Sequence, residues 1–165
     1  MSNEEIKLES KWILWNHKLD DNSWVNDSYN NIFEIVNLID YKILKDIITL
    51  QDLQNTMFFL MRDNIFPTWE DTLNKNGCSI SFKVPSLKIY EIWNKLVSYL
   101  ICENIQRDIK NWNNINGISI SPKKEFNIIK IWLRNDTNEY KNLVKEIDPY
   151  FKLEDSLYKK HELEY

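Results

Sequence analysis

One long amphipathic pattern set among short apolar segments constrains the fold of this chain most. Between Leu87 and Ile101 large apolar residues recur at helical spacing, and Pro85 and Ser86 suit a helix start. The apolar positions are Leu87, Tyr90, Trp93, Val97, Leu100 and Ile101. A shorter helical pattern covers Leu38–Ile48, and Thr137–Ile147 is expected to be a third helix.

The segments around these helices have the character of β-strands. They alternate apolar side chains or form compact apolar runs, and turn-forming residues bound several of them. The expected strands are Lys11–His17, Met57–Met61, Ile80–Val84, Ile118–Ser121, Phe126–Leu133 and Phe151–Tyr158. This mixture predicts the α+β class, with a curved antiparallel sheet that carries three helices on one face. The concave face is then available for a ligand.

Length and composition predict one intracellular domain. The chain has 165 residues, of which 43% are hydrophobic, enough for a single packed core. No apolar run is long enough to span a membrane, and the first ten residues lack the pattern of a signal peptide. We expect a cytoplasmic, monomeric domain over residues 1–165, with residues 1–7 as a short flexible N-terminus. The net charge of −4 argues against nonspecific coating of nucleic acid.

The residue types needed for most catalytic sites are scarce. Cys78 and Cys102 form no metal-binding pair, and His17 and His161 are the only histidines. A chain with 2 glycines cannot supply a glycine-rich phosphate loop. We therefore expect no enzymatic activity, no metal and no cofactor.

The chain contains seven tryptophans, which differ in their surroundings. Trp12, Trp15 and Trp93 lie within apolar periodic segments and are expected in the core. By contrast, Trp24 and Trp69 lie in polar loops beside turn-forming residues and acids. Two rings on separate loops can sandwich a planar base, although loop tryptophans also cover sheets.

Several motifs together resemble a known family. They are KWILW at Lys11–Trp15, NSW ending at Trp24, DNIFPTWED at Asp63–Asp71, the helix around Trp93, and KIW at Lys130–Trp132. From about Leu8 to His161 the chain resembles the eukaryotic translation initiation factor 4E family, which binds the 5′ cap of mRNA. The resemblance implies one curved antiparallel sheet of about eight strands, three α-helices on its convex face, and a cap-binding slot on its concave side.

The resemblance also implies roles for individual residues. Trp24 and Trp69 would stack on the two sides of 7-methylguanine, whose positive charge adds cation–π attraction to stacking. Glu70 would read the guanine edge, because one carboxylate can accept two parallel N–H donors. Trp132 would contact the N7 methyl group. Without the motif, Glu70 would be interpreted as a solvated loop acid.

Only some of the basic residues that bind the cap phosphates in the family are present in this chain. Lys123 stands at the principal arginine position, but Ser79, Glu125 and Ile128 occupy other basic positions. Two nearby lysines could substitute, one of them two residues before Trp132 on the same strand face. The candidate phosphate contacts are Lys123, Lys124 and Lys130.

The surface that binds partner proteins in the family differs even more in this chain. Where the family has a tryptophan on the first helix that receives a helical motif from scaffold or repressor proteins, this chain has Lys42. Asn94 and Ser98 replace two leucines of the same patch, while Leu8 and Leu38 are retained. Loss of a central aromatic anchor costs such an interface about 2 kcal/mol or more. The usual partner is therefore in doubt.

Three functions remain open from the sequence. The first is a translation initiation factor or cap-sequestering regulator that binds capped mRNA, from a divergent protist or a large DNA virus. The second is an interaction module of the same fold that has lost cap binding. The third is a hydrolase acting on nucleotides, which the lack of a metal cluster or activated nucleophile disfavours.

Overall fold

The computed structural model describes residues 6–147 and 149–162, which form one seven-stranded sheet. Its strands are β1 Lys7–Lys18, β2 Asn30–Asn37, β3 Thr56–Arg62, β4 Cys78–Pro85, β5 Ile115–Pro122, β6 Phe126–Leu133 and β7 Leu157–Lys160. The spatial order is β2-β1-β3-β5-β6-β4-β7, and every neighbouring pair is antiparallel. The α+β architecture with a single antiparallel sheet is therefore confirmed.

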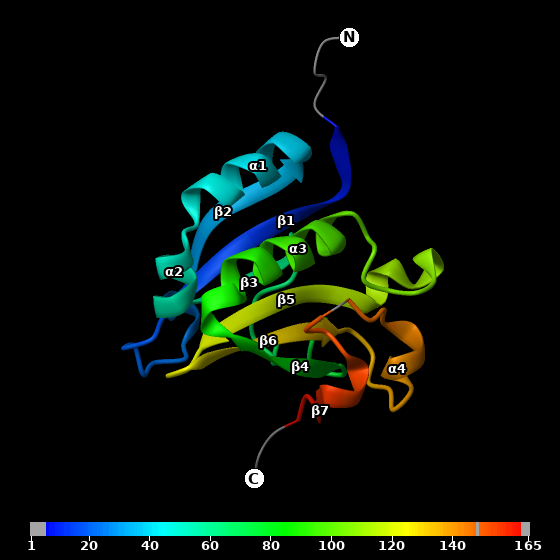
Figure 1. Cartoon of the computed structure of the whole chain (residues 1–165). Helices are drawn as coiled ribbons and strands as arrows, with labels where there is room; N and C mark the ends of the chain where they lie inside the picture. The colour runs from blue at the N-terminus through cyan, green and yellow to red at the C-terminus, as the bar shows by residue number, and fades with distance from the viewer. Residues whose placement is uncertain (1–5, 148, 163–165) are drawn as a thin grey trace.

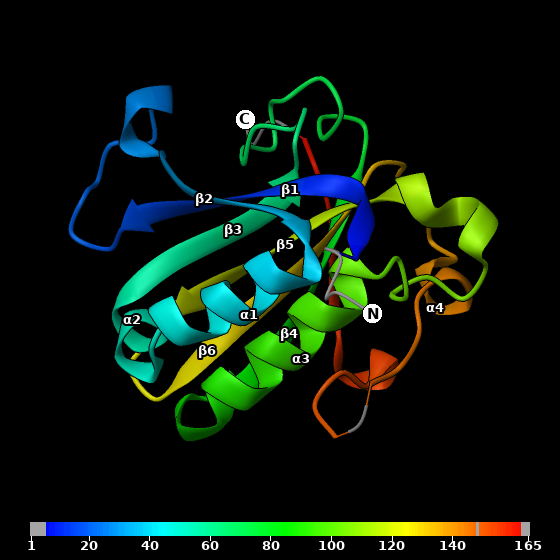
Figure 2. The same cartoon turned by 90° about the horizontal axis from the view of Figure 1, so that it is seen from above.

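Three helices cover one face of this sheet (Figures 1 and 2). They are α1 Leu38–Ile47, α2 Leu50–Asn55 and α3 Ile89–Ile101, and a fourth short helix, α4 Tyr140–Leu143, lies to one side. Local side chains fix where the first two begin. The side chain of Asn37 accepts a hydrogen bond from the Asp40 amide at the start of α1, and Thr49 and Asp52 form a capping box at the start of α2.

The main hydrophobic core lies between the sheet and these helices. Trp12 and Trp93 are almost completely buried in it, as expected from their apolar surroundings. Leu87 is different: it lies in the 3₁₀ turn Ser86–Lys88 before α3, and its side chain is 84% exposed. The expectation that Leu87 belongs to the buried face of this helix is wrong, because the helical geometry begins only at Ile89.

Two expected elements at the C-terminal end have other conformations. Only residues 140–143 of the expected helix Thr137–Ile147 are helical, because Val144 instead pairs with Gln106 in an isolated β-bridge. The expected strand Phe151–Tyr158 begins only at Leu157, and a 3₁₀ turn occupies Leu153–Asp155. The apolar spacing was real in both places, since Val144, Phe151 and Leu153 are buried, but it does not follow one regular element.

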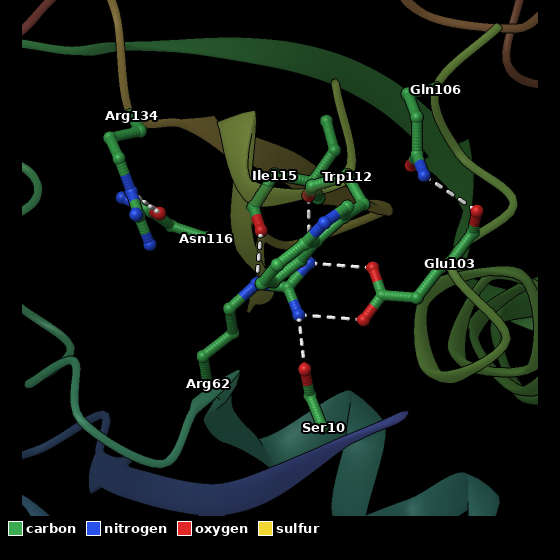
Figure 3. A network of polar contacts seen from close by, with 8 residues as sticks. All are labelled: Ser10, Arg62, Glu103, Gln106, Trp112, Ile115, Asn116 and Arg134. Atoms are coloured by element: carbon green, nitrogen blue, oxygen red, sulfur yellow. Dashed lines mark hydrogen bonds and ion pairs between the residues drawn. The ribbon is translucent and has the colours of Figure 1, made fainter. Parts of the chain in front are cut away.

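A buried ion pair joins β3 to the end of α3 (Figure 3). Both oxygens of Glu103 accept hydrogen bonds of 2.6 Å from the Arg62 guanidinium. The other donors of Arg62 reach the Ser10 hydroxyl and the carbonyl oxygens of Ile115 and Trp112. Trp112, which the sequence left without a role, lies with its ring centroid 4.8 Å from this guanidinium. Arg62 therefore ties three separate segments together.

The N-terminal expectation is tested only in part. Residues 1–5 of the expected flexible segment 1–7 lie outside the described residues, and Lys7 already begins β1. None of the helices in the described part of the chain is long and apolar enough to span a membrane.

Candidate functional site

Two loops lie on the side of the sheet opposite the helices (Figure 2). The loop between β1 and β2 carries Trp24, and the loop between β3 and β4 carries Trp69 and Glu70. In Figure 2 the first is the blue segment that includes the 3₁₀ turn Asn26–Ser28, and the second is the green segment after β3. The structure thus brings the expected base-binding residues to one side of the molecule.

A second, smaller hydrophobic cluster covers this side of the sheet, and we call it the loop-side cluster. Its buried members are Phe59, Met61, Ile65 and Trp132, and Trp15, Tyr29, Met57, Trp69 and Leu73 pack against it. The cluster exists because side chains alternate along a strand, so every second residue of β3 and β6 points away from the main core. Trp132 is anchored within it by a 2.9 Å hydrogen bond from its indole N–H to the Ser119 hydroxyl.

Trp24 lies at the outer end of a row of aromatic rings. Its side chain is 58% exposed, and its ring is stacked on His17 with a centroid distance of 4.1 Å and an interplanar angle of 9°. Tyr29 lies 6.5 Å from Trp24 and 5.6 Å from Phe59, measured between ring centroids. Phe59 in turn lies 6.3 Å from Trp132. Aromatic rings therefore connect the Trp24 loop to the loop-side cluster.

Tyr29 also interacts electrostatically with Glu70 in the β3–β4 loop. Burial, together with a smaller effect of the negative charge of Glu70, raises the pKa of the Tyr29 hydroxyl to about 12. Glu70 itself is exposed. Its carboxylate thus lies within electrostatic range of the aromatic row while remaining accessible to a ligand.

The loop that carries Trp69 and Glu70 is held by side-chain hydrogen bonds. Asp71 accepts from the backbone N–H groups of Phe66 and Leu73 at 3.1 and 2.9 Å. Asn74 is fully buried and donates to the carbonyl oxygens of Phe66 and Thr68. Such bonds fix an irregular backbone that has no ladder partners of its own. These hydrogen bonds therefore hold the IFPTWED segment in a defined conformation.

A cavity of about 450 Å³ opens between this loop and the sheet. Its lining residues are Trp69, Ser79, Lys130, Trp132, Lys159, Lys160, His161 and Glu162. His161 closes one side, where its Nδ1 lies 2.7 Å from the carbonyl oxygen of Asn74. Burial lowers the pKa of His161 from its ordinary value, and the nearby Lys130 and Lys159 lower it further. The cavity thus combines two indole rings with several cationic side chains.

Lysines from three segments surround this region. Lys130 is half-buried, and its pKa is lowered by burial and by the charges of Lys159 and Lys123. Lys123 and Lys130 also line an adjoining cavity of about 290 Å³, which shares Trp132 with the first. Among the described residues, Lys124 lines neither cavity and is exposed at the tip of the β5–β6 hairpin. An anion between Trp132 and β7 would meet converging positive charge.

Sequence reasoning missed Lys159, Lys160 and His161 as members of this site. Strand pairing explains their position, because Ser79 of β4 pairs with Trp132 on one side and with Lys159 on the other. Lys159 thus stands beside the position where the resemblance had placed a missing arginine. The only signal in the sequence was the basic pair after Tyr158, which the expected strand Phe151–Tyr158 left out and which forms the last two residues of β7.

The expected partner surface has a mixed character. Lys42 is exposed on α1, and Leu8 and Leu38 are half-buried against the main core. Asn94 is only 9% exposed, and its side-chain amide donates to the carbonyl oxygen of Tyr90. Ser98 donates to the carbonyl oxygen of Lys95. Asn94 therefore offers little surface to a partner, whereas Lys42 places a charge on it.

Metal ligands do not gather in the described part of the chain, where no group of three or more His, Cys, Asp or Glu side chains could hold an ion.

Comparison with known proteins connects this arrangement to a family. The family model described as eukaryotic initiation factor 4E matches residues 7–165. A homolog of eukaryotic translation initiation factor 4E from Acanthamoeba polyphaga mimivirus is 34% identical over 64 residues, which are 39% of this chain and 24% of the relative. The factor from Eremothecium gossypii is 28% identical over 135 residues, which are 78% of this chain and 62% of the relative. The matched regions therefore cover less than two thirds of these two relatives.

Solved structures share the fold. Ascaris suum eIF4E-3, solved in complex with the m7G cap, is 21% identical with a TM-score of 0.73, over 84% of this chain and 79% of that one. Caenorhabditis elegans eIF4E-3, solved with the 4E-binding protein Mextli and a cap analog, is 21% identical with a TM-score of 0.71, over 80% of this chain and 76% of that one.

Proposed function

We propose that this chain, which belongs to the eukaryotic initiation factor 4E family, binds the 7-methylguanosine 5′ cap of mRNA between Trp24 and Trp69. The observation that supports this most is the placement of both loops on the same side of the sheet as the cavity between Trp69 and Trp132. Relatives of this fold have been solved with cap nucleotides. The chain then acts in translation initiation, or as a cytoplasmic regulator that sequesters caps, without catalysing a reaction.

The base is held by three kinds of contact. The exposed ring of Trp24 and the half-buried ring of Trp69 stack on 7-methylguanine, and its positive charge strengthens both contacts. Glu70, exposed next to Trp69, accepts hydrogen bonds from N1–H and the exocyclic amine of guanine. Trp132, which lines the cavity, contacts the methyl group.

The phosphates bind to lysines from three segments. Lys123 comes from the loop between β5 and β6, Lys130 comes from β6, and Lys159 adds a charge from β7. Burial lowers the pKa of Lys130, and the charges of Lys159 and Lys123 lower it further; an anionic ligand would relieve this repulsion. Lys124, at the hairpin tip, contributes only at longer range.

Helix α1 carries Lys42, the central residue of the proposed protein-binding surface. Relatives of this fold have been solved with 4E-binding proteins. We propose that this chain also binds a scaffold or repressor protein on its helical face, through a contact that accommodates the charge of Lys42 in place of an aromatic anchor. A pull-down with a scaffold-derived helical peptide, with and without Lys42→Trp, tests this. Binding by the wild-type chain that Lys42→Trp weakens is the expected result, and stronger binding by the variant would contradict the proposal.

Titration of intrinsic tryptophan fluorescence tests cap binding. 7-Methyl-GTP should quench strongly and GTP weakly, because the unmethylated base lacks the cation–π contribution. Trp24→Ala and Trp69→Ala should each weaken binding by about 1–3 kcal/mol. Trp112→Phe is the matched control, since Trp112 is also exposed but lies over Arg62. Equal quenching by both nucleotides, or unchanged affinity in both alanine variants, would contradict the sandwich.

Selectivity for guanine is tested separately through Glu70. Glu70→Gln keeps the shape of the side chain but replaces one accepting oxygen by an NH2 donor, so it cannot accept two parallel donors. It should therefore lower affinity for 7-methyl-GTP more than for 7-methyl-ITP, which lacks the exocyclic amine. An equal loss for both nucleotides would assign Glu70 another role.

A further inference from the structure

His17 lies at the end of β1, directly under the loop that carries Trp24. Its side chain is fully buried, and its Nε2 lies 2.9 Å from the carbonyl oxygen of Ser23, the residue before Trp24. Its Nδ1 lies 2.9 Å from the carbonyl oxygen of Lys18. A hydrogen bond to Ser23 holds the loop backbone at the point where the indole side chain leaves it.

The imidazole ring also covers one face of the Trp24 indole. The two rings are nearly parallel, with a centroid distance of 4.1 Å and an interplanar angle of 9°. Tyr29 contacts the same imidazole edge-on at 5.0 Å, so the ring is supported from a second side. Trp24 nevertheless keeps 58% of its surface exposed. A planar ligand can therefore stack on the indole face that His17 leaves open.

We propose that His17 is a positioning residue for ligand binding, which orients Trp24 through ring stacking and through its hydrogen bond to the Ser23 carbonyl. The order of layers is then His17, Trp24 and the ligand base. Without His17 the Trp24 loop would have to be ordered when the ligand binds, and that entropy cost would lower affinity. This inference rests on the proposed function, because it takes the ligand to be a stacked base.

Further contacts support the backbone around this histidine. A neutral imidazole carries one N–H and can donate to only one of the two carbonyl oxygens. The Asp21 carboxylate accepts from the Ser23 N–H at 2.8 Å, and Tyr29 packs edge-on against the imidazole. On β3, Met57 pairs with His17.

The stack can be measured without a ligand. The emission of an indole depends on the group stacked on it, so His17→Ala should change the tryptophan fluorescence spectrum of the chain at constant pH. This change should be absent when His17→Ala is made in a Trp24→Phe background. A change that persists undiminished in that background would overturn the placement of the two rings.

Binding to 7-methyl-GTP then tests the positioning role. Loss of one base-stacking contact lowers affinity about 5- to 150-fold, so His17→Ala should weaken binding about fivefold or more, without exceeding the effect of Trp24→Ala. In a Trp24→Ala background His17→Ala should have no further effect, because it acts only through that ring. His17→Phe, which keeps a flat ring under Trp24, should recover part of the loss and controls for a folding defect in His17→Ala.

The outcomes separate this inference from the proposed function. Wild-type affinity in His17→Ala, or an additional loss in the Trp24→Ala background, would overturn the role of His17 while leaving cap binding in place. Absence of binding by the wild-type chain would overturn both.

Discussion

Replacing Glu103 by glutamine should strongly destabilise the chain. Side chains of Arg62 and Glu103 are only 4% and 6% exposed, and two hydrogen bonds of 2.6 Å join them. The guanidinium cannot turn toward water, because Trp12 and Trp112 lie against it with centroid distances of 4.4 and 4.8 Å. Breaking such a buried pair leaves an uncompensated charge and costs about 3–5 kcal/mol.

The cost can be measured by thermal unfolding. For a chain of this size a loss of 1 kcal/mol lowers the Tm by about 2–4 °C, so Glu103→Gln should lower it by about 6–20 °C. Glutamine is a better replacement than glycine because Glu103 has a positive φ of 54°. Glycine would relieve that backbone strain while it removes the charge, so two opposite effects on stability would be measured together. Glu34→Gln is the control, because Glu34 is 54% exposed and pairs with Lys11 at the surface. A Tm within about 2 °C of wild type in Glu103→Gln would refute the argument that this pair is desolvated.

Three further predictions follow from the site. Lys130→Gln and Lys159→Gln should each reduce the slope of log affinity against log salt for 7-methyl-GTP by about 1, while 7-methylguanosine, which has no phosphate, should bind unchanged; unchanged slopes would exclude them as phosphate contacts. Because the pKa of His161 is lowered in the folded state, the unfolded state binds more protons below pH 6.5. Stability should therefore fall as the pH falls through that value, and His161→Gln should lessen the fall in urea midpoint between pH 7 and pH 5. Burial raises the pKa of the Cys78 thiol to about 11, so at pH 8 a thiol reagent should label the exposed Cys102 alone until the chain is unfolded.

Elements with strong local patterns were predictable from the sequence. The buried runs of β1 and β3, the β5–β6 hairpin and helix α1 all occur close to their expected bounds. Each has enough apolar residues at one period to determine its conformation locally. The placement of Trp24 and Trp69 in loops was also predictable, because polar turn-forming residues surround both and no apolar period runs through either segment.

Elements that depend on distant partners were not predictable. Strand β2 has three asparagines among eight residues, and it is a strand because it pairs with β1 and buries Ile35 against the main core. Helix α2 is short, with 6 residues, and relies on the capping box of Thr49 and Asp52. Neither gives a periodic signal long enough to recognise in isolation.

The same limit applies to the candidate site. Trp24, Trp69 and Glu70 could be proposed as candidates because two local motifs carry them. The contributions of Lys159 and of the His17–Trp24 stack arise from strand register and loop conformation, which bring together residues that are not adjacent in a motif. Physical contact across strands is a property of the whole sheet, and a single sequence does not display it.

Two hydrophobic clusters lie on opposite sides of the sheet, and the regions that they stabilise should differ in the free energy needed to open them. The large cluster under the helices holds the central strands β3 and β5, whose amide hydrogens should exchange with solvent only when the whole chain unfolds. The loop-side cluster has four buried members, so the two loops above it can open locally at a lower cost in free energy. A bound ligand should therefore slow amide exchange in those loops while leaving the slowest amides of the sheet unchanged.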